Sequence, residues 1–215
     1  MSELEKIYVK GVRILSPFDY NDLYEVIPQR HHQTILDVCL WTGMRYVEVQ
    51  RLHKHPEWIM KARNCIFLPE EAQLKLKRRQ LQRYIYPIPP QLSSILPYFF
   101  DNPTPPAQEN WNENLKRWAL KAGITEREQF HENDNTRLKV ITGLKGISSK
   151  MTRKTIESWM FAIRIPENEI CLRQGHDRAT SLKHYQGLPF TPYEKSEIRA
   201  RLSSWNVEQI EDFYR

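Results

Sequence analysis

Residues 30–45 read RHHQTILDVCLWTGMR. The apolar side chains of this stretch recur every three or four residues, as on one face of a helix: Ile35, Val38, Cys39 and Trp41. Gly43 follows them at the position where a glycine commonly ends a helix. We therefore expect one helix from about Arg30 to Trp41 and a second helix that restarts at about Met44.

The rest of the chain is also mostly helical in pattern, with one exception. Apolar positions at helical spacing lie between Trp111 and Ala122, from about Thr152 onward, and between Pro166 and Gly175. Between Asn64 and Pro90, two short apolar runs flank a basic turn, which predicts a β-hairpin. Two stretches without periodicity are expected to be exposed loops: residues 101–110 and 131–136. The expected fold class is mainly α with a small antiparallel β-sheet (α+β).

The composition favours a basic protein of the cytoplasm. The 215 residues include 32 Lys and Arg against 26 Asp and Glu, a formal net charge of +6. Such an excess favours a polyanionic partner, such as a nucleic acid. The three cysteines stand apart in apolar surroundings and predict core residues rather than disulfides: Cys39, Cys65 and Cys171. No export signal or long apolar run is apparent, so we expect no membrane span.

Four short patterns occur in a fixed order along the chain. They are Thr42-Gly43-Met44-Arg45, a basic turn with Lys75 and Lys77, Lys150-Met151-Thr152-Arg153, and Gly175-His176 followed nine positions later by Tyr185. An acidic residue, Glu48, stands three positions after the first arginine. Together, their order and spacing resemble those of the tyrosine recombinases, the family of the phage-type integrases.

The resemblance spans roughly Ser16 to Pro192. It implies the catalytic-domain fold of that family and a catalytic set in this order: Arg45, Lys75 or Lys77, Lys150, Arg153, His176 and Tyr185. Lys150 stands where many members carry histidine. This departure makes the chain most similar to archaeal and archaeal-virus integrases, as do Arg173-Gln174-Gly175-His176 and His184-Tyr185.

The resemblance also predicts how the chain is organised and what it assembles with. We expect a catalytic domain over residues 1–189 and a helical tail over 190–215, without the N-terminal core-binding domain that most integrases carry. The apolar face of the tail packs on its own domain by default. In the family such a tail often contacts a neighbouring protomer, and a homo-oligomer on DNA, a dimer or a tetramer, is expected.

Two arginines suit the chemistry of phosphodiester cleavage. The transition state gathers negative charge on the non-bridging oxygens, and guanidinium groups bind those oxygens with forked donors. Arg45 and Arg153 are the candidates, and Glu48 would share a helical face with Arg45 and hold its guanidinium. Lys150 would lie on the same face as Arg153, where it would hydrogen-bond the phosphate or help to move the tyrosine proton.

The nucleophile and the proton donors complete the expected site. A phenol with a pKa near 10 attacks poorly until nearby positive charge or a base favours the phenolate. Tyr185 would join the 3′-phosphate as a phosphotyrosine, and His176 would donate to a non-bridging oxygen. Lys75 or Lys77 would protonate the leaving 5′-oxygen, as a hairpin lysine does in the family, and spacing does not choose between them. Three arginines are expected to bind the DNA backbone: Arg78, Arg79 and Arg83.

No cofactor is expected, because the phosphotyrosine preserves the bond energy for the reverse step, and no metal is expected, because the His53-x-His55 pattern lacks partners at ligand spacing. The predicted function is a site-specific recombinase acting on a host chromosome or on viral or plasmid DNA, for integration or excision of a viral or mobile genome. Two rival hypotheses stand beside it. One is a type IB topoisomerase-like enzyme that relaxes DNA, and the other is a non-catalytic DNA-binding protein on the same fold.

Overall fold

The computed structural model describes residues 6–72, 82–125, 128–134, 137–144, 146–175, 185, 187–203 and 205, and only the backbone within 128–143. Its helices are α1 Pro17–Val26, α2 Arg30–Thr42, α3 Tyr46–Lys54, α4 Pro90–Asp101, α5 Gln108–Lys121, α6 Lys150–Ala162, α7 Glu167–Gln174 and α9 Pro192–Arg201. The fold class is thus confirmed as mainly helical with small antiparallel sheets.

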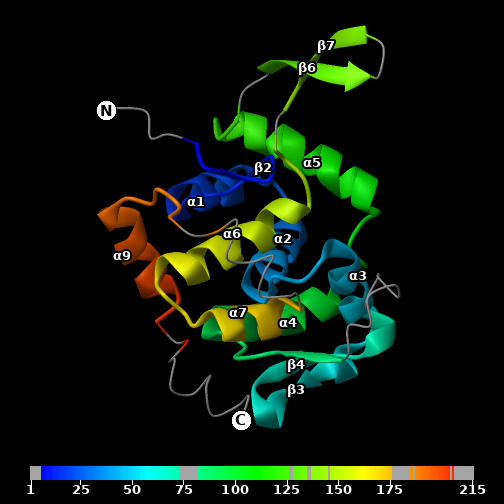
Figure 1. Cartoon of the computed structure of the whole chain (residues 1–215). Helices are drawn as coiled ribbons and strands as arrows, with labels where there is room; N and C mark the ends of the chain where they lie inside the picture. Colours follow the sequence, from blue (N-terminus) through cyan, green and yellow to red (C-terminus); the bar gives the residue numbers. More distant parts are fainter. Residues whose placement is uncertain are drawn as a thin grey trace.

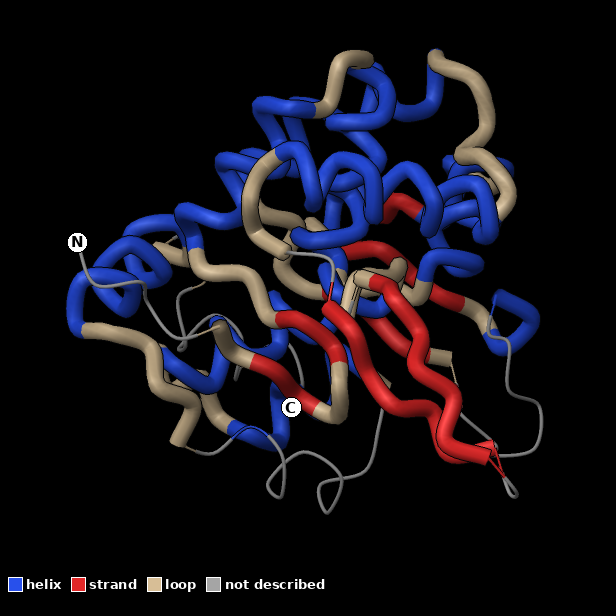
Figure 2. The backbone as a smooth tube through the Cα atoms, turned by 90° about the horizontal axis from the view of Figure 1, so that it is seen from above, coloured by secondary structure: helices blue, strands red, loops and turns tan. Residues whose placement is uncertain are grey.

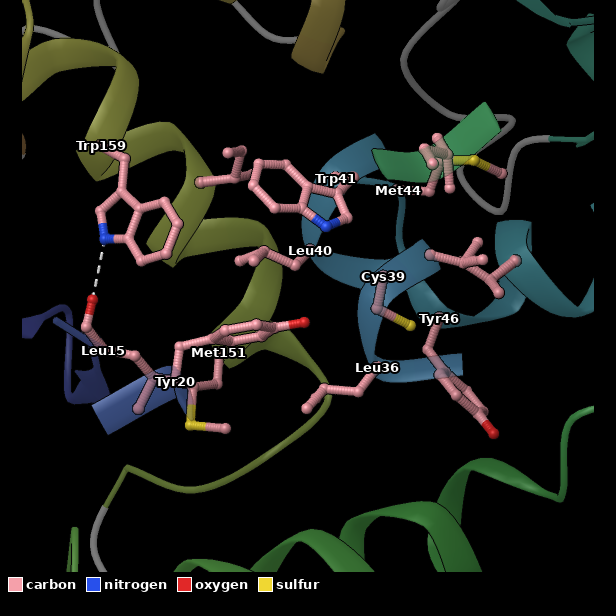
Figure 3. Packing of buried hydrophobic residues seen from close by; sticks show 14 of the residues in the cluster. Leu15, Tyr20, Leu36, Cys39, Leu40, Trp41, Met44, Tyr46, Met151 and Trp159 are labelled. Atoms are coloured by element: carbon pink, nitrogen blue, oxygen red, sulfur yellow. Dashed lines mark hydrogen bonds between the residues drawn. The ribbon is translucent and has the colours of Figure 1, made fainter. Parts of the chain in front are cut away.

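Helix α6 crosses the middle of the molecule and contacts α2, α7 and α9 (Figure 1). Its Trp159 ring is fully buried, and the indole Nε1 donates a hydrogen bond of 2.9 Å to the Leu15 carbonyl oxygen (Figure 3). One turn earlier, the Thr155 hydroxyl oxygen accepts a bond of 3.0 Å from the Leu15 backbone N–H. The apolar side chains of α1, α2 and α6 therefore meet in one core, to which these two hydrogen bonds attach Leu15.

The turn between α2 and α3 forms as the sequence predicts. Gly43 ends α2 in the left-handed conformation, with a φ of 63°, and its N–H donates to the Leu40 carbonyl oxygen. Arg45 is the N-cap of α3, which begins at Tyr46, two residues after the expected restart. The Glu48 carboxylate accepts a bond of 2.7 Å from the Arg45 backbone N–H, as in a capping box.

The hairpin predicted between Asn64 and Pro90 is confirmed. Strand β4, Cys65–Leu68, pairs antiparallel with β5, Arg83–Ile85, in a register that places Leu68 opposite Arg83. A short strand that was not expected, β3 (Ile59–Met60), adds to the other side of β4 and makes a three-stranded sheet. Residues 73–81 of the connecting turn lie outside the described residues.

A second hairpin corrects one sequence prediction. Strands β6 (Glu128–Asp134) and β7 (Arg137–Gly143) pair over their whole length, from Glu128 opposite Gly143 to Asp134 opposite Arg137. The hairpin stands out from the helical body (Figures 1 and 2). The loop expected over 131–136 was wrong at 131–134, because backbone pairing forms a strand without the apolar alternation on which the prediction relied. A third pair, β1 (Tyr8–Val9) with β2 (Val12–Arg13), lies near the start of the chain.

The other expected loop was only partly right. Helix α4 extends to Asp101 and α5 begins at Gln108, so the non-helical connection is shorter than 101–110. The three cysteines are buried and free, as predicted. In the part of the chain that the structure describes, none of the helices has the length and apolar character needed to cross a membrane.

The chain beyond Phe190 packs on the same molecule as far as it is described. Helix α9 contacts α1 and α6, and the Tyr193 ring stacks on Phe18 with ring centroids 5.2 Å apart. Trp205 is buried, and the Arg173 guanidinium carbon lies 4.3 Å from the centre of its ring. This part of the tail therefore belongs to the core of its own chain.

The turn at Gly43 yields a stability prediction. A Cβ at residue 43 would overlap the side-chain amide of Gln174, which is fully buried, whereas a Cβ at Gly123 would meet nothing within 4 Å. Both glycines have a positive φ. Gly123→Ala should cost about 1 kcal/mol from backbone strain alone, and Gly43→Ala about 3 kcal/mol because overpacking is added. Urea unfolding measures both values, and equal losses would mean that the contact with Gln174 is unimportant.

Candidate functional site

Three arginines from distant parts of the chain converge on one carboxylate and form what we call the arginine cluster. Arg45 precedes α3, Arg83 lies in β5 and Arg153 lies in the first turn of α6. The carboxylate is that of Glu48 in α3, and its side chain has no exposed surface. The two arginines that the sequence predicts to bind one phosphate are therefore brought to the same site.

Both oxygens of the Glu48 carboxylate accept hydrogen bonds. Its Oε1 accepts from Nη1 of Arg45 at 2.7 Å and from Nη1 of Arg83 at 3.3 Å. Its Oε2 accepts from Nη2 of Arg83 at 2.8 Å, in addition to the Arg45 backbone N–H. The fork-to-fork pairing sets both the distance and the plane of the Arg83 guanidinium. Glu48 positions Arg45 through one side-chain bond and the bond to its backbone N–H, and the Arg45 side chain remains 27% exposed.

The surrounding positive charge keeps Glu48 ionised although it is buried. Burial alone would raise the pKa of this carboxyl group, but the charges of Arg83 and Arg153 outweigh it. The hydrogen bonds from Arg83 and the charge of Arg45 act in the same direction, and together they lower the pKa to about 2. Glu48 is therefore an anion at any pH at which the protein would work.

Arg153 is held by the backbone of two other segments. Its Nη1 donates a bond of 2.7 Å to the Gly43 carbonyl oxygen, and its Nη2 donates to the Gln174 carbonyl oxygen at the end of α7. Burial lowers the pKa of the guanidinium to about 10, with a further contribution from the positive charge of Arg83. Arg153 nevertheless stays protonated near neutral pH, and its place depends on the turn at Gly43.

Arg83 is not where the sequence analysis put it. It was expected at the surface, along a DNA backbone, but its side chain is buried between Glu48 and Gly175. A Cβ at Gly175 would lie 2.9 Å from Cδ of Arg83, so the glycine leaves room for this arginine. Strand β5 directs the side chain of residue 83 inward. The sequence showed that this residue is charged but not which way its side chain points.

Tyr185 is buried beside α6. Its side chain is 7% exposed, and its ring stacks on Phe161 with centroids 5.5 Å apart and planes 6° apart. Burial, the charge of Glu157 and a hydrogen bond to that carboxylate raise the pKa of the phenol well above its ordinary value, while Arg153 acts to lower it. The phenol is therefore within the electrostatic reach of the arginine cluster, but its immediate partner is an acid.

Glu157 is the residue of this site that the sequence analysis missed. It lies in α6, four positions after Arg153, and is 2% exposed. The signal was present, because residues four apart on a helix share a face. However, a search for phosphate-binding residues looks for positive charge, and a buried acid one helical turn from Arg153 is the opposite.

The remaining predicted residues divide into two groups. Lys150 is exposed at the start of α6, three positions before Arg153, as expected from its spacing. The others lie outside the described residues: Lys75, Lys77, Arg78, Arg79 and His176. Their contacts with the arginine cluster stay predictions.

The two histidines of the His-x-His pattern have separate partners. His53 Nε2 lies 2.8 Å from the Asn102 carbonyl oxygen, and His55 Nδ1 lies 2.7 Å from a carboxylate oxygen of Glu57. Among the described residues, no group of three or more His, Cys, Asp or Glu side chains is arranged to hold a metal ion.

The low pKa of Glu48 predicts a loss of stability in acid. The group is held below its ordinary value of 4.5 in the folded state, at about 2, so its contribution is complete above about pH 4.5 and is lost as the pH falls towards 2. This contribution is on the order of 3 kcal/mol. The gap in unfolding free energy between wild type and Glu48→Gln should therefore shrink as urea titrations move from pH 5 to about pH 3. The exposed Glu70→Gln variant measures the background, and a gap that does not change with pH would contradict the prediction.

The sequence was compared with known proteins. No protein-family model matches the chain, and no curated protein sequence is significantly similar to it.

Proposed function

We propose that the protein is a tyrosine site-specific DNA recombinase, which cleaves and rejoins DNA through a 3′-phosphotyrosine intermediate. The observation that carries the proposal is the convergence of Arg45 and Arg153 around the ionised Glu48, with Tyr185 close enough for the charge of Arg153 to act on its phenol. These residues are 140 positions apart along the chain, from Arg45 to Tyr185.

The arrangement supplies what a phosphodiester needs in order to be exchanged. Arg45 and Arg153 stabilise the charge that grows on the two non-bridging oxygens, and they are preorganised by Glu48 and by backbone carbonyl groups. The Tyr185 oxygen forms a bond to phosphorus while the bond to the 5′-oxygen breaks. The phenol proton passes to solvent, a transfer that Lys150 is the candidate to assist, and the 5′-oxygen gains a proton from an acid, for which Lys75 and Lys77 are the candidates. A second 5′-hydroxyl can reverse the step because the phosphate ester is conserved.

The substrate and the setting follow from the same proposal. Double-stranded DNA is the partner, the outcome is integration or excision of a viral or mobile genome, and strand exchange requires a homo-oligomer on DNA. The net charge of +6 supports binding to a polyanion.

One observation favours a rival. The described state of Tyr185, buried and paired with an acid, also fits a non-catalytic DNA-binding protein on a recombinase-like fold. Covalent attachment to DNA separates the two, because only the enzyme forms it.

A nicked suicide DNA substrate provides the first test. Wild type should form a covalent protein–DNA adduct with its target site, and Tyr185→Phe should form none because it lacks the nucleophilic oxygen. Tyr193→Phe is the matched control, since Tyr193 is 65% exposed and lies on α9 away from the arginine cluster. Denaturing gel electrophoresis detects the adduct. An adduct with the Tyr185→Phe variant would remove Tyr185 from the role of nucleophile.

The arginine clamp provides the second test. Arg45→Lys and Arg153→Lys keep a positive charge but lose the forked donors, so each should lower the single-turnover cleavage rate by about 10²–10³. Arg199→Lys, on the exposed side of α9, is the control and should cleave like wild type. Thermal unfolding by circular dichroism identifies any variant that fails to fold. Cleavage at the wild-type rate by either clamp variant would show that its guanidinium does not contact the phosphate.

A further inference from the structure

One face of α6, next to the arginine cluster, carries three residues at a spacing of four: Arg153, Glu157 and Phe161. Side chains four apart lie one above the other on a helix. The first belongs to the proposed phosphate clamp, and the other two both contact Tyr185. One helical face therefore sets the position of the nucleophile relative to Arg153.

The two contacts act on different parts of the tyrosine. Phe161 lies parallel to the ring, with planes 6° apart, and restricts where the ring can lie. The Glu157 carboxylate accepts the hydrogen bond of the phenol and places a negative charge beside it. Both effects of the carboxylate favour the neutral phenol over the phenolate. A phenol that keeps its proton and donates it only as a hydrogen bond to a carboxylate is a poor nucleophile, because little phenolate is present.

Glu157 is also within electrostatic reach of Arg153. Its negative charge raises the pKa of that guanidinium against the larger opposite effect of burial. A phosphate bound to Arg153 would bring a second negative charge close to Glu157, and the two anions would repel each other. A phosphate bound at Arg153 would therefore weaken the contacts of the Glu157 carboxylate, including the hydrogen bond that it accepts from the Tyr185 phenol.

We propose that Glu157 is a positioning residue that holds Tyr185 in an unreactive resting position until a DNA phosphate occupies Arg153. This inference rests on the proposed recombinase function and adds a regulation of its site. The restraint prevents the nucleophile from attacking before the phosphate is clamped. Removing the charge of Glu157 while keeping its shape should therefore release Tyr185 and speed up cleavage.

Two measurements on Glu157→Gln test the restraint. The first needs no DNA: tetranitromethane nitrates tyrosines through the phenolate, and peptide mass spectrometry reports the rate for each tyrosine. Tyr185 should be nitrated about tenfold faster in the variant, as for a phenol whose pKa falls by about one unit. Tyr20, which is buried and bonded to Asp37, and the exposed Tyr193 serve as internal references whose rates should not change.

The second measurement is the single-turnover cleavage of the suicide substrate, where Glu157→Gln should be about tenfold faster than wild type for the same reason. The control is Glu194→Gln, which removes another buried carboxylate but keeps the helix-capping arrangement of α9. Thermal unfolding confirms that both variants fold.

The outcomes separate the restraint from the proposed function. Unchanged nitration of Tyr185 overturns the restraint whatever the DNA shows. Faster nitration with slower cleavage also overturns it, because the carboxylate would then assist the reaction, for example as the proton acceptor. Faster nitration in a protein whose wild type forms no adduct leaves the restraint on Tyr185 standing and refutes the recombinase function instead.

Discussion

The buried carboxylate of Glu48 is the interaction on which the rest of the site depends. Three guanidinium groups close to one another would repel, and burying any of them without a counter-ion would be costly. Glu48 supplies that counter-ion and receives enough hydrogen bonds to remain ionised. It also caps α3 through the Arg45 backbone N–H, so the same group fixes a helix start and the direction of the Arg45 side chain.

The site contains two buried acids with opposite partners. Glu48 faces arginines, and its charge is stabilised by them. Glu157 faces a phenol and stabilises the neutral form of that phenol. Arg153 lies within reach of both acids and is held in place by backbone oxygens from Gly43 and Gln174. Helix α6 connects these effects, because it carries Arg153 and Glu157 on one face.

Much of the helical part of the fold could be predicted because its signals are local. The end of α2 at Gly43, the start of α3 after Arg45, and α7 between Pro166 and Gly175 each follow from a periodic apolar face and a terminating residue. The β6–β7 hairpin was not found in this way, since β6 shows no apolar alternation and the alternation in β7 is limited to residues 137–140. The pairing of Arg45 with Glu48 was predictable as well, from a spacing of three residues on one helix.

By itself, the sequence determined most of the helices, though not α1 or α4, together with the β4–β5 hairpin and the order of the proposed site residues, because these depend on spacing along a few turns of chain. Only the tertiary structure decided which of the arginines are buried together and which acid lies against Tyr185. Arg83 turns inward to Glu48 across 35 residues, and Tyr185 meets Glu157 across a stretch of chain that includes the whole of α7. Such contacts depend on how whole elements pack, and no local pattern of residues records that packing.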